Sequence, residues 1–191
     1  MITRALKGLE DVISVSVVHP TWQKTRPDDE ADAHCGWVFR DESDPPMQSP
    51  AGYGSFPCAG CVPDDVCGAT TVREIYDKVG YDGKKFTVPI LFDKKTMKIV
   101  NNESSEIIRM LNAAFNEFCD EKAVPGARDR DLYPAELRGA IDAANAWIYD
   151  SINNGVYKCG FAQSQQAYDG AVAALFEGLE RVRLRLYPTP D

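Results

Sequence analysis

The sequence has no long hydrophobic run, few histidines and less positive than negative charge. No segment approaches the roughly 20 consecutive apolar residues that a membrane-spanning helix needs, so a membrane protein is not predicted. No basic segment followed by an apolar stretch marks a secretory leader after Met1, and we expect a cytoplasmic protein. Lys and Arg number 21 against 29 Asp and Glu, for a formal net charge of −8. This balance argues against a nucleic-acid partner, because phosphate contacts need clustered basic side chains.

Cysteine occurs six times in 191 residues, which is far from a disulfide-rich scaffold, and we expect reduced thiols. Cys58-Ala59-Gly60-Cys61 has the C-x-x-C spacing of zinc ligands, and Cys67 follows, yet a single such pair is a weak signal. Incidental loop cysteines are the favoured interpretation, so we expect no metal. A zinc-binding module built on these three cysteines is the least favoured alternative.

The pattern of apolar residues predicts an α/β domain in the first part of the chain. Thr71 and Glu74 have the spacing of a capping box, which opens a helix. Alternating β-branched residues indicate strands, and the 3.6-residue period indicates helices. In chain order the predicted elements are a helix over 1–10, a strand over 12–18, an irregular proline-rich stretch over 20–68, a helix over 71–80, strands over 86–92 and 97–100, and a helix over 103–118.

Two amphipathic helices are predicted after a polar link at 120–131. Apolar residues recur at helical spacing from Leu137 to Ile152, and Asn153-Asn154-Gly155 is expected to end the first helix. Ser164 is the predicted cap of the second, whose apolar stripe continues to Leu186. Two such stripes need a further surface to cover them, so the C-terminal half is expected to be incomplete.

Val88-Pro89 interrupts the strand predicted over 86–92. A proline inside a strand removes a backbone donor and is usually confined to an edge. The residues alone therefore favour a trans Val88–Pro89 bond in an edge strand, since cis is the minor form of X–Pro bonds in folded proteins. The alternative, a cis bond, would turn the Val88 backbone outward, where it could pair with an incoming peptide.

The sequence Asn102-Glu103-Ser104-Ser105 opens the helix predicted over 103–118. Free N–H groups and the positive end of the helix dipole attract a carboxylate, and the Ser104 hydroxyl adds a donor. Glu103 could pair with an amine of the same ligand, so a small zwitterion fits this end. Plain helix capping, which needs no ligand, is the alternative. A proline-bearing strand, a hairpin partner and a helix that opens with Glu-Ser together form the unit that binds glutathione in thioredoxin-like transferases.

Four segments resemble the glutathionyl-hydroquinone reductases, also called the Xi class of glutathione transferases. They are KGLEDVISVSVVHP, HCGWVF, VPILFDKKTMKIVNNESSEIIRMLN and IYDSINNGVYKCGFA. The resemblance covers roughly residues 6–181, with a divergent patch around 50–66. It implies an α/β, thioredoxin-like glutathione-binding domain over residues 1–119, without its first strand. An incomplete, all-α C-terminal domain of the glutathione transferase type follows over residues 131–191.

The resemblance also implies the ligands and the residues that hold them. Glutathione is the co-substrate, and a glutathionyl-hydroquinone is the small-molecule substrate. Tyr157 matches a tyrosine that hydrogen-bonds the aromatic substrate, with Tyr149 as the alternative. The residues that match the glutathione site are Trp37, as its indole wall, with Val88, Pro89, Glu103 and Ser104. Judged only by its apolar neighbours, Trp37 would instead be a core residue.

In this family the nucleophile is a cysteine at the start of the first helix, in an N-P-x-C-P-W-A type motif. It attacks the sulfur of the glutathionyl-hydroquinone, and a second glutathione resolves the resulting Cys–glutathione mixed disulfide. The present chain begins inside that helix, so the nucleophilic cysteine is absent from it and we expect no turnover. A non-catalytic glutathione-binding module is the alternative function. The resemblance implies a homodimer, but missing helices argue against dimerisation of this chain.

Overall fold

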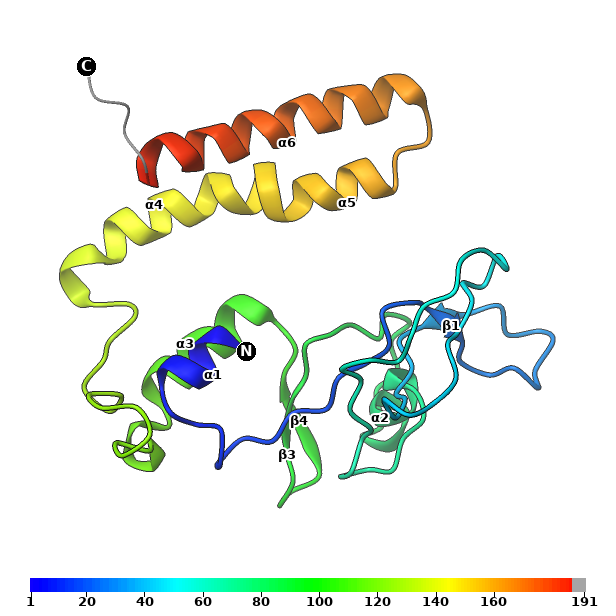
Figure 1. The fold of residues 1–191 in the computed structure, drawn as a ribbon, viewed down its shortest axis with the longest axis horizontal. Helices are drawn as coiled ribbons and strands as arrows, with labels where there is room; N and C mark the ends of the chain where they lie inside the picture. The colour runs from blue at the N-terminus through cyan, green and yellow to red at the C-terminus, as the bar shows by residue number, and fades with distance from the viewer. Residues whose placement is uncertain (187–191) are drawn as a thin grey trace. The chain divides into compact units, whose positions relative to one another are not determined.

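A computed structural model describes residues 1–186 (Figure 1). The chain divides into two compact units, Met1–Asp131 (unit 1) and Leu132–Asp191 (unit 2). Residues 187–191, the last five of the domain predicted over 131–191, lie outside the described residues. Among the described residues, no helix combines the length and apolar character needed to cross a membrane.

Three short helices frame unit 1: α1 (Ile2–Leu6), α2 (Val72–Lys78) and α3 (Ser104–Ala113). The predicted cap by Thr71 is confirmed at α2, but the return bond of the capping box is displaced, because Glu74 bonds the residue before the N-cap and not Thr71 itself. The Thr71 hydroxyl accepts from the Glu74 N–H at 3.2 Å, and the Glu74 carboxylate accepts from the Thr70 N–H at 2.8 Å. α3 is shorter than predicted, because the chain leaves it after Ala113 and makes a 3-10 turn at Asn116–Phe118.

The strand predicted over 12–18 is wrong. Val12 and Ile13 donate their N–H groups to the Leu9 carbonyl at 3.2 and 2.9 Å, so this end of the segment is a turn. The extended backbone after this turn pairs through single residues with two separate loops, and no continuous strand forms. Its pairings are isolated antiparallel bridges, Val17 with Val62 and Val18 with Phe39.

The hairpin predicted in the middle of the chain is present. β3 (Leu91–Asp93) and β4 (Lys98–Asn101) pair antiparallel, and the register places Leu91 opposite Asn101. β3 is shorter than the strand predicted over 86–92, because the backbone before Leu91 is irregular. The hairpin therefore starts just after Pro89 and ends just before α3.

The proline-rich stretch 20–68 is mostly irregular, and hydrogen bonds hold parts of it in place. It contains a second antiparallel pair, β1 (Gln23–Lys24) with β2 (Cys35–Gly36). His19, fully buried at its start, accepts the Thr21 N–H at Nδ1 over 3.1 Å. The hydrogen is therefore on Nε2, which donates to the Phe56 carbonyl at 3.2 Å. His19 thus anchors the loop as a structural residue.

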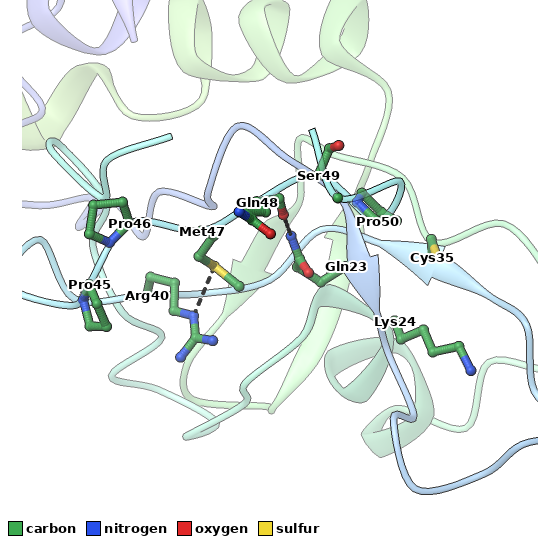
Figure 2. A pocket seen from close by; sticks show the side chains of 11 residues that line it. Gln23, Lys24, Cys35, Arg40, Pro45, Pro46, Met47, Gln48, Ser49 and Pro50 are labelled. Atoms are coloured by element: carbon green, nitrogen blue, oxygen red, sulfur yellow. Dashed lines mark hydrogen bonds between the residues drawn. The ribbon is translucent and has the colours of Figure 1, made fainter. Parts of the chain in front are cut away.

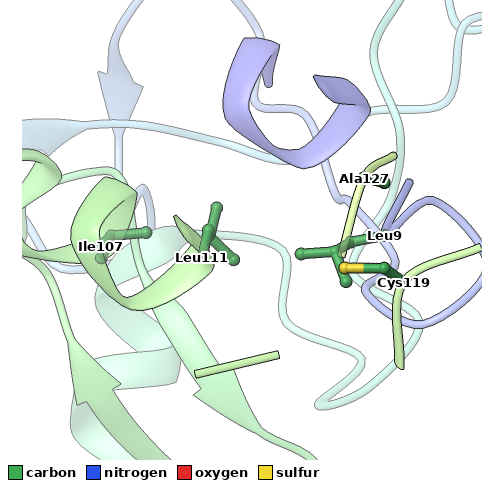
Figure 3. Packing of buried hydrophobic residues seen from close by; sticks show 5 residues of the cluster. All are labelled: Leu9, Ile107, Leu111, Cys119 and Ala127. Carbon is green, nitrogen blue, oxygen red and sulfur yellow. The ribbon is translucent and has the colours of Figure 1, made fainter. Parts of the chain in front are cut away.

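Residues from the beginning and the end of unit 1 meet in its hydrophobic core (Figure 3). Leu9, just after α1, and Ala127 are fully buried. They cluster with Ile107 and Leu111 of α3 and with Cys119, each less than 10% exposed. Cys119 is thus a packing residue, and the apolar face of α3 is covered by chain segments more than 90 positions apart.

Close backbone approaches fix the segment after α1. Gly8 has φ +58°, and a Cβ there would lie 3.0 Å from the carbonyl oxygen of Asp120, whose own N–H donates to the Gly8 carbonyl at 2.9 Å. The neighbouring Lys7 is fully buried, and its Nζ donates to the carbonyls of Arg130 at 2.7 Å and Arg128 at 3.4 Å. These contacts hold residues 7 and 8 against the segment at 120–130.

Unit 2 is a helical hairpin. Its first arm runs through α4 (Arg138–Ile148), a π-helical turn (Tyr149–Asn153) and α5 (Asn154–Gly160), and its second arm is α6 (Gln165–Leu186). The helix stop predicted at 153–155 is wrong, because Gly155 is buried and used for packing: a Cβ there would lie 3.2 Å from Leu175 Cδ1. The predicted cap is confirmed, since Ser164 Oγ accepts from the Ala167 N–H at 3.2 Å.

Candidate functional site

The β3–β4 register brings the two halves of the predicted ligand site to one end of the hairpin. Leu91 lies opposite Asn101, so Pro89, two residues earlier, and Glu103, two residues later, continue in the same direction. The Val88–Pro89 bond is cis, which corrects the trans bond that the residues alone favoured. Val88 is 38% exposed, so the residue lies at the surface of unit 1.

The first turn of α3 forms the other half. Glu103 is the N-cap, and its Oε1 accepts from the Ser105 N–H at 3.3 Å. Asn101 Oδ1 accepts from the Glu103 N–H at 2.6 Å, which holds the N-cap residue in place. Glu103 and Ser104 are both exposed. Within residues 1–186, the three donors to the Glu103 carboxylate, the Ser105 N–H and the hydroxyls of Ser104 and Ser105, all use Oε1.

Side chains from three segments connect these halves. The Asn102 amide donates to the hydroxyl of Thr87 at 2.8 Å and to the hydroxyl of Tyr76 at 3.1 Å. The Tyr76 hydroxyl in turn donates to the Thr87 carbonyl at 3.0 Å. Thr87 immediately precedes Val88, and Asn102 immediately precedes Glu103. The sequence reading did not single out Tyr76 or Thr87, because their partners lie too far along the chain for a spacing pattern.

Trp37 lies beside the N-terminal end of α2. Its carbonyl accepts from the N–H of Val72, the first residue of α2, at 3.0 Å, and its ring packs edge-on against Trp22 with centroids 5.6 Å apart. The Trp37 side chain is half-buried. Over the described part of the chain, no hydrogen bond or ring contact joins it to Val88 or Glu103. Hydrogen bonds thus connect the segments that carry Val88-Pro89 and Glu103-Ser104, and none of these bonds includes Trp37.

An aromatic and polar cluster supports the segment before Val88. The Phe86 ring lies edge-on to His34, with centroids 5.1 Å apart, and the Arg73 guanidinium lies 5.3 Å from its centre. Arg73 also forms a 2.6 Å ion pair with Asp32. Burial, and next the Arg73 charge, hold the pKa of His34 below its usual value. A hydrogen bond from the His34 backbone N–H is the main cause that lowers the pKa of Asp32.

The tyrosines predicted to face the aromatic substrate belong to unit 2. Tyr157, on α5, is 63% exposed, and Tyr149, in the π-helical turn, is 54% exposed. The Tyr157 ring is stacked with that of Phe161, with an interplanar angle of 16° and centroids 6.5 Å apart. Both hydroxyl-bearing rings are thus accessible on the surface of their own unit.

The six cysteines are free thiols. Cys58 and Cys61 are buried, at 1% and 4% exposure, in a turn closed by a 2.9 Å bond from the Cys61 N–H to the Cys58 carbonyl. Burial raises the pKa of Cys61 and of Cys67, which disfavours their nucleophilic thiolate forms. Across residues 1–186, no cluster of three or more His, Cys, Asp or Glu side chains could hold a metal ion. The cysteines are therefore not gathered as zinc ligands.

A surface hollow of about 900 Å³ lies within the proline-rich stretch, between β1 and residues 45–52 (Figure 2). Lys24, Cys35 and Arg40 line it, and Arg40 Nε contacts the sulfur of Met47 at 3.2 Å. None of the residues that line it belongs to the predicted glutathione site. The hollow is open and separate from the groups gathered at α3.

The chain was compared with known proteins. It is 44% identical over 184 residues to the glutathionyl-hydroquinone reductase YqjG of Escherichia coli, covering 95% of this chain and 46% of that protein. The crystal structure of the glutathione transferase Xi from Phanerochaete chrysosporium matches with a TM-score of 0.74 and 43% identity, over 98% of this chain and 54% of that one. The glutathione-bound structure of Escherichia coli YqjG matches with a TM-score of 0.72 and 41% identity, over 95% of this chain and 49% of that one. No protein-family model matches the sequence.

These likenesses define a chain of the glutathione transferase type, with the corresponding fold. Within that class, the chain belongs to the Xi glutathione transferases, or glutathionyl-hydroquinone reductases, as the resemblance implied. It spans about half the length of the curated relatives it matches.

Proposed function

We propose that this chain carries the glutathione-binding surface of a glutathionyl-hydroquinone reductase. The observation that carries the proposal is the meeting of Val88-Pro89 and Glu103-Ser104 at one end of the β3–β4 hairpin, in a chain homologous to such reductases. Residues 1–119 then correspond to the thioredoxin-like domain and residues 131–191 to the C-terminal helical domain of glutathione transferases.

Each group has a chemical role in this proposal. The backbone of Val88, a residue at the surface, pairs with the cysteinyl part of glutathione, as an added strand would. The N-terminus of α3 and the Ser104 hydroxyl bind the γ-glutamyl carboxylate, since helix N-termini favour anions. Glu103 pairs through Oε2 with the α-amino group, and Trp37 would contribute the indole wall.

The reaction of the whole protein would proceed by thiol exchange. A cysteine thiolate attacks the sulfur of the glutathionyl-hydroquinone, the carbon–sulfur bond breaks, and the aromatic carbon takes a proton as the hydroquinone leaves. Tyr157 would hydrogen-bond the aromatic substrate. A second glutathione then displaces the enzyme thiolate and forms oxidised glutathione. None of the six cysteines in these 191 residues stands in a C-P-W motif, so we propose that this chain by itself binds glutathione without turnover.

Isothermal titration of the 191-residue chain with reduced glutathione tests this function. We expect saturable binding that Glu103→Ala abolishes, because the amine loses its carboxylate partner. Glu117→Ala, which removes an exposed charge beyond α3, should leave the affinity unchanged. Absence of binding to the wild-type chain would overturn the proposal. Release of hydroquinone from a glutathionyl-hydroquinone by this chain alone would overturn its non-catalytic part.

A further inference from the structure

The side chain of Asn102 occupies a junction between three segments of unit 1. Its Nδ2 carries two hydrogens and donates to two hydroxyls, those of Thr87 at 2.8 Å and Tyr76 at 3.1 Å. Thr87 belongs to the irregular segment before β3, Tyr76 to α2, and Asn102 itself to the link between β4 and α3. One amide therefore joins the segments that lead into both halves of the proposed glutathione site.

The donors and acceptors in this junction are consistent with one another. The Tyr76 hydroxyl has a single hydrogen, which it gives to the Thr87 carbonyl at 3.0 Å, and it accepts one hydrogen from Asn102. The Thr87 hydroxyl accepts the other hydrogen of the same amide. The Thr87 hydroxyl also lies 3.4 Å from the Tyr76 hydroxyl, to which it can donate its own hydrogen. Four contacts rather than one therefore define the geometry of the junction.

The tyrosine at the centre of the junction is rigidly held. Tyr76 is only 3% exposed. Its ring packs against Tyr81, with centroids 4.9 Å apart, and against Phe86 at 5.7 Å. A buried aromatic ring with such neighbours fixes the position of its hydroxyl. The exposed Asn102 side chain is thus anchored to a fixed point.

We propose that Asn102, with Tyr76, is a positioning residue that sets the spacing between the Val88 backbone and the first turn of α3 for glutathione binding. This role rests on the proposed function. Groups that bind through backbone atoms, such as Val88 and the N–H of Ser104, cannot be adjusted by their own side chains. Their spacing depends on the residues beside them, and Thr87 and Asn102 are those residues.

A ligand that touches both halves gains affinity only when their spacing matches its length. We take the cost of misplacing one half of the site to be that of one hydrogen bond to the ligand, about 1 kcal/mol, which corresponds to about fivefold in the dissociation constant. Asn102→Ala and Tyr76→Phe should therefore each weaken the binding of reduced glutathione about fivefold. Since both break the same junction, the double variant should bind about as weakly as either single variant.

Matched variants separate positioning from general destabilisation. Tyr81→Phe removes a hydroxyl from the same aromatic cluster but leaves the junction intact, so it should bind glutathione like the wild type. Thr87→Ser keeps the hydroxyl and should also retain the affinity, whereas Thr87→Val should lose it. In ¹H–¹⁵N spectra of the free chain, Asn102→Ala should shift the amides of both Val88 and Ser104, and Tyr76→Phe should shift the same two.

The titrations and spectra give distinct outcomes. If the wild-type chain binds glutathione and Asn102→Ala binds equally well, the positioning role is overturned while the proposed function stands. A 25-fold loss in the double variant would also overturn it, because independent effects multiply. If the wild-type chain does not bind glutathione, both proposals fail. Should Asn102→Ala not fold, Tyr76→Phe with Thr87→Ser as its control decides the question by the same criteria.

Discussion

Unit 1 and unit 2 position their predicted ligand residues by different means. In unit 1, Val88 and Glu103 lie in irregular backbone or at a helix start, and side-chain hydrogen bonds through Asn102 hold them. In unit 2, Tyr157 projects from the regular helix α5, and the helix itself defines where it points. The comparison indicates that the site in unit 1 depends on a few long-range polar contacts, whereas the surface of unit 2 depends on how closely two helices pack.

The close packing in unit 2 relies on glycine. A Cβ at Gly178 would lie 2.8 Å from Ser151 Oγ and 3.1 Å from Ile152 Cγ1, so only a residue without a side chain allows α6 to approach the first arm this closely. Unit 1 has instead a cluster of buried apolar side chains around α3. Three experiments sharpen or break this comparison.

The largest effect is expected in the core of unit 1. Leu9→Ala should lower the free energy of unfolding by about 2–5 kcal/mol, because Leu9 is fully buried and its removal leaves a cavity. Ile108→Ala, at a position 50% exposed on α3, should change it by less than about 0.5 kcal/mol. Urea denaturation measures both, and hydrogen exchange assigns the loss to residues 1–131. Similar effects for the two variants would contradict the assignment of Leu9 to the core.

A smaller effect of the same sign is expected at the helix contact of unit 2. Gly178→Val should destabilise the hairpin by about 1–3 kcal/mol, because the new side chain overlaps Ser151 and Ile152. Gly170→Ala, on the same helix and with nothing within 4 Å of the new Cβ, should stabilise it by about 0.5–1 kcal/mol. Thermal unfolding followed by circular dichroism compares the two. Opposite signs support the packing role of glycine, and a stabilising Gly178→Val would refute it.

The smallest effect is a dependence of stability on pH that arises from His34, which lies in unit 1. Burial and Arg73 lower the pKa of His34 from 6.5, so the folded form takes up fewer protons than the unfolded form as the pH falls below 6.5. Stability should therefore decrease below that pH and be fully present above it. His34→Gln should flatten this part of the profile, as measured by urea denaturation over a pH series. Hydrogen exchange of residues 132–186 should show no such dependence.

Local signals in the sequence predicted the elements whose contacts are local. The cap by the Thr71 hydroxyl forms as expected because its partner, the Glu74 N–H, is three residues away. The β3–β4 hairpin and the helix at Ser104 were likewise predictable from neighbouring residues. The residues of the candidate site in unit 1 came from their motif, and the register of the hairpin brings them together.

Elements that depend on distant partners were not predictable in this way. The segment 12–18 has the composition of a strand, but its residues pair singly with two separate loops. Asn102 contacts Tyr76 and Thr87, which lie 26 and 15 positions away, and no periodic pattern links residues at such separations. Gly155 resembles a helix stop, yet it is a packing residue, because its partner Leu175 is contributed by the second arm.

The buried Lys7 has a consequence for chemical labelling. Its ammonium group is enclosed and donates to two backbone carbonyls near the end of unit 1, so an amine-reactive reagent cannot reach it in the folded chain. Exposed lysines such as Lys94 would be modified first. A mass increment at Lys7 would then report that the N-terminal segment has detached. The rate of modification at Lys7 therefore measures how often this part of unit 1 opens.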